Sequence, residues 1–167
     1  RIRNPARRLH QVASLAREMK QLERFCLFSS AFVSGQRTGL ILEEELDMGQ
    51  GMRTTFERNM GLCEELAREL MPVLPTCVLR PSAMIGQLQT GGTGGLLEGP
   101  SYLLSLMLKL PSELPLMVPG RGVVPFNIVP VEYVSAASWH IATSPRSMGR
   151  TFHLTDPNPV SAKRAFE

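Results

Sequence analysis

The chain has few of the residues on which metal-binding and disulfide-bonded proteins depend. It contains three cysteines, three histidines and one tryptophan in 167 residues. The cysteines are odd in number and have no metal-ligand spacing, which favours a reducing, cytoplasmic environment with inert buried thiols over a disulfide framework. The histidines are scattered along the chain, so the spacing does not indicate a zinc site. We therefore expect no bound metal.

The charge is also too small and too local to indicate a nucleic-acid site. The formal net charge is +3, and four arginines lie within the first eight residues. No aromatic residues are interleaved with them, so a solvated helix face is the better interpretation. The sequence also has no apolar run of the roughly 20 residues that cross a membrane as a helix. We expect neither nucleic acid nor a membrane-spanning segment.

What the sequence does contain is an alternation of short apolar strands with helices. The apolar run at 25–28 leads into a segment rich in hydroxyl groups, which predicts a buried strand that ends in a loop. Further strands are predicted at 76–79 and 151–155, and helices at 1–21, 54–71 and 129–140. A helix between two strands favours parallel pairing. The order thus predicts an α/β fold in which the strands at 25–33 and 76–79 are adjacent and parallel.

Two of the predicted helices carry an apolar stripe. In helix 1–21 the stripe consists of Leu9, Val12, Leu15, Ala16 and Met19. In helix 54–71 it consists of Phe56, Met60, Cys63, Ala67 and Leu70. Apolar residues at this spacing lie on one face of a helix. We therefore expect both stripes, including Phe56 and Met60, to pack into the core.

Four segments occur in an informative order. They are Phe28–Gly35 (FSSAFVSG), the helix bearing Glu64, Leu79–Gly86 (LRPSAMIG) and Val129–Val134 (VPVEYV). Together they resemble the extended short-chain dehydrogenase/reductase family, and within it the branch of fatty acyl reductases, male-sterility proteins and thioester reductases. The resemblance implies the C-terminal part of a Rossmann-like, doubly wound parallel sheet, with NAD(P) as the cofactor of the complete parent.

The resemblance also implies where the catalytic groups should lie. Ser30 is similar to the family's catalytic serine, whose hydroxyl hydrogen-bonds the substrate carbonyl or alcohol. The family's Tyr-x-x-x-Lys motif begins the next helix, commonly with an acidic residue four positions after the lysine. Glu64 matches that acidic residue, so Phe56 stands at the tyrosine position and Met60 at the lysine position. Phe56 has no exchangeable proton and Met60 has no charge, so impaired redox chemistry is expected.

Contacts to the cofactor are implied for Pro81, Ser82 and Met84. The family's glycine-rich turn, which binds the pyrophosphate at a helix N-terminus, has no counterpart in these 167 residues. With Met60 in place of lysine, this predicts that the chain alone does not bind a dinucleotide tightly. The glycine-rich segment 90–95 follows no predicted strand and fits neither phosphate-binding pattern, so an ordinary loop is favoured there over a phosphate site.

The length corresponds to one domain, whereas reductases of this branch are longer. We expect a single partial domain over 1–167, with a sheet-and-helix core at 1–95 and 127–157, a substrate-side region at 96–126, and the N-terminal cofactor-binding half absent. The sheet edge left open should be covered by the rest of the parent protein or by another subunit. The Leu- and Met-rich residues of 96–126 either pack on the sheet or line a groove for acyl chains, and their spacing does not distinguish the two.

Two functions of different kinds remain open. The first is a portion of an NAD(P)-dependent reductase that acts on an acyl thioester, aldehyde or related carbonyl and is impaired because the tyrosine and lysine are missing. The second is a degenerate, non-catalytic domain that binds a ligand or a partner on the same fold. The family resemblance favours the first, and the chemistry of Phe56 and Met60 favours the second.

Overall fold

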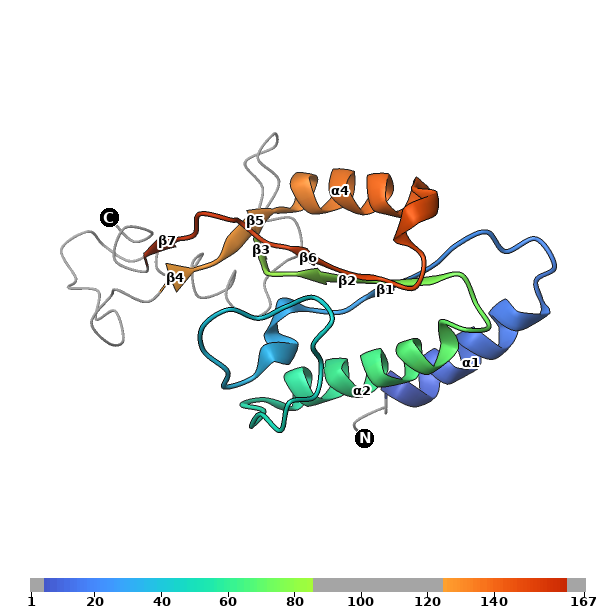
Figure 1. Ribbon diagram of the computed structural model, residues 1–167, viewed down its shortest axis with the longest axis horizontal. Helices are drawn as coiled ribbons and strands as arrows, with labels where there is room; N and C mark the ends of the chain where they lie inside the picture. Colours follow the sequence, from blue (N-terminus) through green and yellow to red (C-terminus); the bar gives the residue numbers. More distant parts are fainter. Residues whose placement is uncertain (1–4, 86–124, 162–167) are drawn as a thin grey trace, which may run out of the picture. The chain divides into compact units, whose positions relative to one another are not determined.

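The computed structural model describes residues 5–85 and 125–161 (Figure 1). The glycine-rich segment 90–95 and most of the predicted substrate-side region, 96–124, lie outside these residues. The chain divides into two units, one formed by 1–81 with 137–154 and the other by 82–136 with 155–167.

The first unit holds α1 (Pro5–Glu18), β1 (Phe25–Phe28), the short 3-10 helix η1 (Ala31–Ser34), α2 (Thr55–Leu70), β2 (Thr76–Pro81), the 3-10 helix η2 (Pro145–Ser147) and β6 (Thr151–Leu154). The second unit holds β3 (Ala83–Ile85), β4 (Pro125–Phe126), β5 (Ile128–Pro130) and β7 (Val160–Ser161). Helix α4 (Val131–Thr143) begins in the second unit and ends in the first.

A parallel sheet of β1, β2 and β6, in that spatial order, forms the centre of the first unit. Strands β1 and β2 are adjacent and parallel, and α2 joins them. The predicted pairing is therefore confirmed. In Figure 1, α1 and α2 lie on one face of this sheet and the C-terminal half of α4 lies on the other. Every residue of β2 is buried, as expected for a central strand covered on both faces.

Helix α1 packs through small side chains rather than through its predicted stripe. Ala13 and Ala16 are buried against Leu70 of α2 and the neighbouring loop, whereas Val12 and Leu15 are 54% and 62% exposed. The prediction is therefore wrong for most of the larger residues of the stripe. Alanine lets two helices approach closely, whereas a larger side chain would hold them apart. Helix α1 therefore packs against α2 with the face that carries Ala13 and Ala16.

The start of α2 is fixed by a pair of caps. Thr54 accepts a hydrogen bond on Oγ1 from the amide of Glu57 at 3.1 Å, and Glu57 accepts one on Oε2 from the amide of Arg53 at 2.6 Å. This arrangement is close to a capping box, and it turns Glu57 inward. Phe56 is consequently 53% exposed and Met60 is only half-buried. The prediction that Phe56 packs into the core is wrong.

In the described residues of the second unit, two small strand pairs and a side-chain clasp connect the chain. Strand β3 pairs with β5 in parallel, and β4 pairs with β7 antiparallel. Asn127 donates from Nδ2 to the carbonyl of Asp156 at 2.8 Å and accepts on Oδ1 from the Asp156 amide at 3.0 Å. Among the helices of the described residues, none is long and apolar enough to span a membrane.

Candidate functional site

Ser30 lies at the carboxyl end of β1, where the chain turns into η1. Its Oγ accepts a hydrogen bond from the amide of Phe32 at 3.3 Å and donates a long one to the carbonyl of Pro81 at 3.5 Å. Ser30 is buried, and Pro81 ends the neighbouring strand β2. The carboxyl ends of parallel strands are where α/β folds bind their ligands, so Ser30 is placed for such a role.

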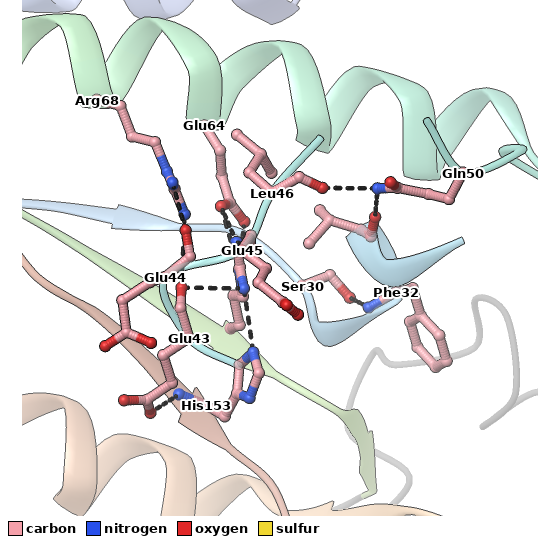
Figure 2. A network of polar contacts seen from close by, with 12 residues as sticks. Ser30, Phe32, Glu43, Glu44, Glu45, Leu46, Gln50, Glu64, Arg68 and His153 are labelled. Carbon is pink, nitrogen blue, oxygen red and sulfur yellow. Dashed lines mark hydrogen bonds and ion pairs between the residues drawn. The ribbon is translucent and has the colours of Figure 1, made fainter. Parts of the chain in front are cut away.

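The turn that carries Ser30 is attached to the long loop before α2. Gln50 donates from Nε2 to the carbonyls of Val33 at 3.1 Å and Leu46 at 2.7 Å. Figure 2 shows the contact between Gln50 and Leu46. Gly35 has φ +57°, and a β-carbon there would collide with the carbonyl of Gly51. Only glycine therefore allows this loop to close on η1.

The loop is anchored in turn by a buried arginine of β2, which contacts the Glu43, Glu45 and Glu64 labelled in Figure 2. Arg80 pairs with Glu64 of α2, with Nη2 to Oε2 at 2.7 Å and Nε to Oε1 at 3.0 Å. Arg80 also donates to the carbonyls of Glu43 at 3.4 Å and Glu45 at 2.8 Å. The side chains of the ion pair are 1% and 0% exposed. The pair is thus neutralised internally, and it holds the loop against the sheet.

Arg68 of α2 extends this anchor. It donates from Nη1 to the carbonyl of Glu44 at 2.7 Å and from Nη2 to that of Glu43 at 3.4 Å. Burial and the nearby charge of Arg80 lower the pKa of Arg68. Three consecutive carbonyls of the loop, at 43–45, therefore accept hydrogen bonds from two arginines.

Sequence reasoning missed the role of this network. Glu64 served only to align a motif, and Arg80 received no role. A usable signal was present, because an arginine within the apolar strand TCVLRP must find a buried partner.

His153 of β6 completes the network. Its Nε2 lies 3.1 Å from Nη1 of Arg80, and its amide donates to Oε1 of Glu43 at 2.7 Å. Because arginine can only donate, Nε2 accepts and the imidazole is the neutral tautomer with its proton on Nδ1. Burial lowers the pKa of His153, and the charge of Arg80 lowers it further against the opposing effect of Glu43, Glu64 and Glu44.

This pKa shift predicts a pH dependence of stability. Below about pH 6.5, the ordinary value for histidine, the unfolded chain binds a proton that the folded chain does not. We expect the free energy of unfolding to fall as the pH drops through this range, and His153→Gln to flatten the dependence. Amide hydrogen exchange of β6, followed as a function of pH, measures this change in the free energy of unfolding. His140→Gln, on the exposed side of α4, is the control, and an unchanged slope in His153→Gln would contradict the assignment.

The other expected site residues have different environments. Phe56 and Met60 lie in the first two turns of α2, exposed and half-buried. Ser82 is buried, and its hydroxyl has no hydrogen-bond partner in the described part of the chain. Met84 is half-buried in β3. The Ser82 hydroxyl suits a polar ligand, but Phe56 and Met60 supply neither a proton nor a cation. By their chemistry, Phe56 and Met60 therefore do not fit the roles that a tyrosine and a lysine have toward a nicotinamide cofactor.

Two further features of the described residues bear on the site. A cavity of about 200 Å³ lies between the loop and α2, and its lining does not include Ser30, Phe56 or Met60. Its lining residues are Leu46, Asp47, Gln50, Met52, Arg58, Gly61, Leu62 and Glu65. Within 5–85 and 125–161, no group of three histidine, cysteine or acidic residues is arranged to hold a metal ion.

A parallel sheet with a serine at the end of one strand, followed by a helix and a second strand, is the arrangement expected of an extended short-chain dehydrogenase/reductase, and the solved R domain reported below shares it. Residues 6–138 match the NAD-binding family described as male sterility protein. The chain belongs to that family, which confirms the resemblance seen in the sequence.

Curated relatives are much longer than this chain. It is 29% identical over 161 residues to the aldehyde reductase lnaA of Aspergillus flavus, covering 90% of this chain and 13% of the relative. It is 31% identical over 106 residues to the non-canonical nonribosomal peptide synthetase FrzA of Cladobotryum sp, covering 61% of this chain and 10% of the relative. The chain thus spans about a tenth of each relative's length.

Solved structures agree on the fold. The terminal R domain from the myxalamid PKS-NRPS biosynthetic pathway matches with a TM-score of 0.75 at 25% identity, covering 95% of this chain and 39% of that one. The dTDP-glucose 4,6-dehydratase of Bacillus anthracis in complex with NAD matches with a TM-score of 0.70 at 17% identity, covering 95% and 48%. The Rossmann-like α/β fold predicted from the sequence is confirmed.

Proposed function

We propose that this chain is part of an NAD(P)-dependent reductase domain that acts on an acyl thioester, aldehyde or related carbonyl, and that its redox chemistry is impaired. The proposal rests on two residues in the first two turns of α2. The phenyl ring of Phe56 is exposed where the family has a tyrosine, and Met60 stands where it has a lysine. The site keeps its serine but has lost the proton donor and the cation.

Ser30 is the polar group left to act on a carbonyl. Its hydroxyl donates only a long 3.5 Å bond to the carbonyl of Pro81, so a substrate oxygen can take that bond over at little cost. A serine hydroxyl without a base or a cation is weakly acidic, however. Ser30 therefore orients and polarises a carbonyl oxygen, but it does not protonate the developing alkoxide.

The substrate class is supported by the relatives. One is an aldehyde reductase, another is a peptide synthetase, and one of the matching solved structures is a terminal R domain from a PKS-NRPS biosynthetic pathway. Aldehydes and acyl thioesters share an electrophilic carbonyl, which a single hydroxyl at the end of β1 is suited to bind.

A second function is favoured by the exposure of Phe56. An apolar ring on the surface, at a position where the family has a reacting group, fits a domain that binds a ligand or partner without turning it over. Steady-state assays of the complete protein with acyl thioesters and aldehydes distinguish the two. NAD(P)H consumption matched by alcohol or aldehyde product supports the impaired reductase, and binding of substrate without any product supports the binding domain.

A titration of this chain alone tests the cofactor expectation. Isothermal calorimetry with NADH and with NADPH should show no saturable heat at millimolar cofactor, because Met60 cannot donate a hydrogen bond to the ribose. A thermal melt of the same sample establishes that it is folded. Saturable binding of either dinucleotide to the folded chain would refute this expectation.

A further inference from the structure

Two cysteines lie side by side on adjacent strands of the central sheet. Cys26 of β1 and Cys77 of β2 are register partners on adjacent parallel strands, and their Sγ atoms are 3.3 Å apart. Adjacent strands lie about 4.8 Å apart, within the range of Cα separations that a disulfide bridges. Cys77 is 0% exposed, but Cys26 is only half-buried, so the expectation that all three thiols are buried is wrong for Cys26.

We propose that Cys26 and Cys77 are a redox modification site, in which a hydroperoxide converts the two thiols into a disulfide between β1 and β2. The backbone is already at bridging distance, and the sulfurs need to close from 3.3 Å to a bond of about 2.05 Å. The strands joined by the bridge are the two whose carboxyl ends carry Ser30 and Pro81. The bridge would therefore fix those two ends relative to each other.

The reaction proceeds in two steps. The sulfur of Cys26, as a thiolate, attacks one peroxide oxygen, so that an S–O bond forms, the O–O bond breaks, and the departing oxygen takes a proton to leave as water or alcohol. The sulfur of Cys77 then attacks the sulfenic sulfur of Cys26, so that the S–S bond forms and the S–O bond breaks. The Cys77 proton leaves with that oxygen as water. Two electrons pass from the two sulfurs to the peroxide.

The order of attack follows from the surroundings of the two thiols. Burial, together with the contact with Cys26, raises the pKa of Cys77 to about 12, so Cys77 stays protonated at neutral pH and acts second. Arg24, whose Nε donates to the carbonyl of Ala142 at 3.0 Å, holds a positive charge beside the pair and opposes that rise. Cys26 is the more accessible thiol and meets the peroxide first.

Cys63 provides a matched control within the same unit. It is buried in α2, and burial raises its pKa, with the charge of Glu64 adding to the effect. In the described part of the chain it has no sulfur partner, unlike the other two. It should therefore remain a thiol while the pair oxidises.

The test is peroxide treatment of the complete protein, followed by alkylation of free thiols in denaturant and peptide mapping without reduction. Of the three cysteines of this chain, one should remain alkylated, Cys63, and a peptide linking Cys26 to Cys77 should appear. After reduction with dithiothreitol, all three cysteines should be alkylated. Cys63→Ser should leave the linked peptide unchanged, and Cys77→Ala should abolish it and leave a dimedone-reactive sulfenic acid at Cys26.

The proposal fails if Cys26 of the unaltered protein accumulates as a sulfenic or sulfinic acid without the linked peptide. It also fails if Cys26 is found joined to another copy of the chain, or if both thiols survive peroxide that oxidises exposed methionines such as Met48. Peptide mapping of the unaltered protein decides whether the disulfide forms. The test therefore remains valid even if the Cys77→Ala variant does not fold.

Discussion

Replacing Phe56 with tyrosine and Met60 with lysine in the complete protein is expected to raise reductase turnover by about two to four powers of ten. The tyrosine would supply a proton to the developing alkoxide, and the ammonium would lower the phenol pKa and hold the nicotinamide ribose. Steady-state turnover of acyl thioesters and aldehydes, measured as NAD(P)H consumption, gives the ratio. Turnover of the unaltered protein is the reference.

The structure indicates that both substitutions can be accommodated. Phe56 is 53% exposed, so an added hydroxyl does not enter a packed core. Met60 is half-buried, so the aliphatic stem of a lysine can take its place without burying the ammonium completely. The desolvation cost of the new charge is therefore small compared with that of a fully buried ammonium.

Each single substitution should achieve much less than the pair. Phe56→Tyr alone leaves a phenol with a pKa near 10, which is a poor match to neutral pH. Met60→Lys alone should tighten cofactor binding without supplying a proton. A gain from the pair that exceeds the product of the two single gains is the signature of two coupled groups.

The chain also supplies matched controls. Phe28→Tyr with Met48→Lys adds the same two groups at exposed positions, since Phe28 is as exposed as Phe56 and Met48 is exposed in the loop. These changes should leave turnover as it was. If Phe56→Tyr with Met60→Lys folds and binds cofactor but stays inert, the site has changed beyond these residues, and the binding domain becomes the better proposal.

The second large effect concerns stability. Glu64→Gln is expected to destabilise the first unit by about 3–5 kcal/mol, because it leaves the buried guanidinium of Arg80 without a counter-charge. Amide hydrogen exchange of β2 in the complete protein measures the loss locally. Glu65→Gln, on the exposed side of the same helix, should cost almost nothing. Equal effects of the two substitutions would contradict the role given to the ion pair.

Arg80→Met removes the ion pair and part of the loop anchor together. It should destabilise β2 and in addition release the carbonyl of Glu45 and leave that of Glu43 bound by Arg68 alone, which would speed cleavage of the loop by a protease. Combining it with Glu64→Leu removes both buried charges and should recover part of the stability of β2, but not the protection of the loop. A double variant with full protection of the loop would show that Arg68 alone is sufficient to hold it.

The sequence by itself determined the order of the elements, the parallel pairing of β1 with β2 and the family. These features depend on local periodicity and on short segments such as LRPSAMIG, and both can be read along a single chain. The assignment of Phe56 and Met60 to the positions of the family's tyrosine and lysine rests on the spacing from Phe56 to Met60 to Glu64, and it stays a prediction, as does its catalytic consequence.

Only the tertiary structure decided which way the helices face and which side chains meet. Periodicity marks the apolar residues of a helix, but its rotation about its own axis was set by the Glu57 cap, the Arg80–Glu64 pair and the alanines of α1. These contacts exposed Phe56 and buried two glutamates of α2. The meeting of Cys26 and Cys77 depends likewise on strand register, which no single segment of the sequence encodes.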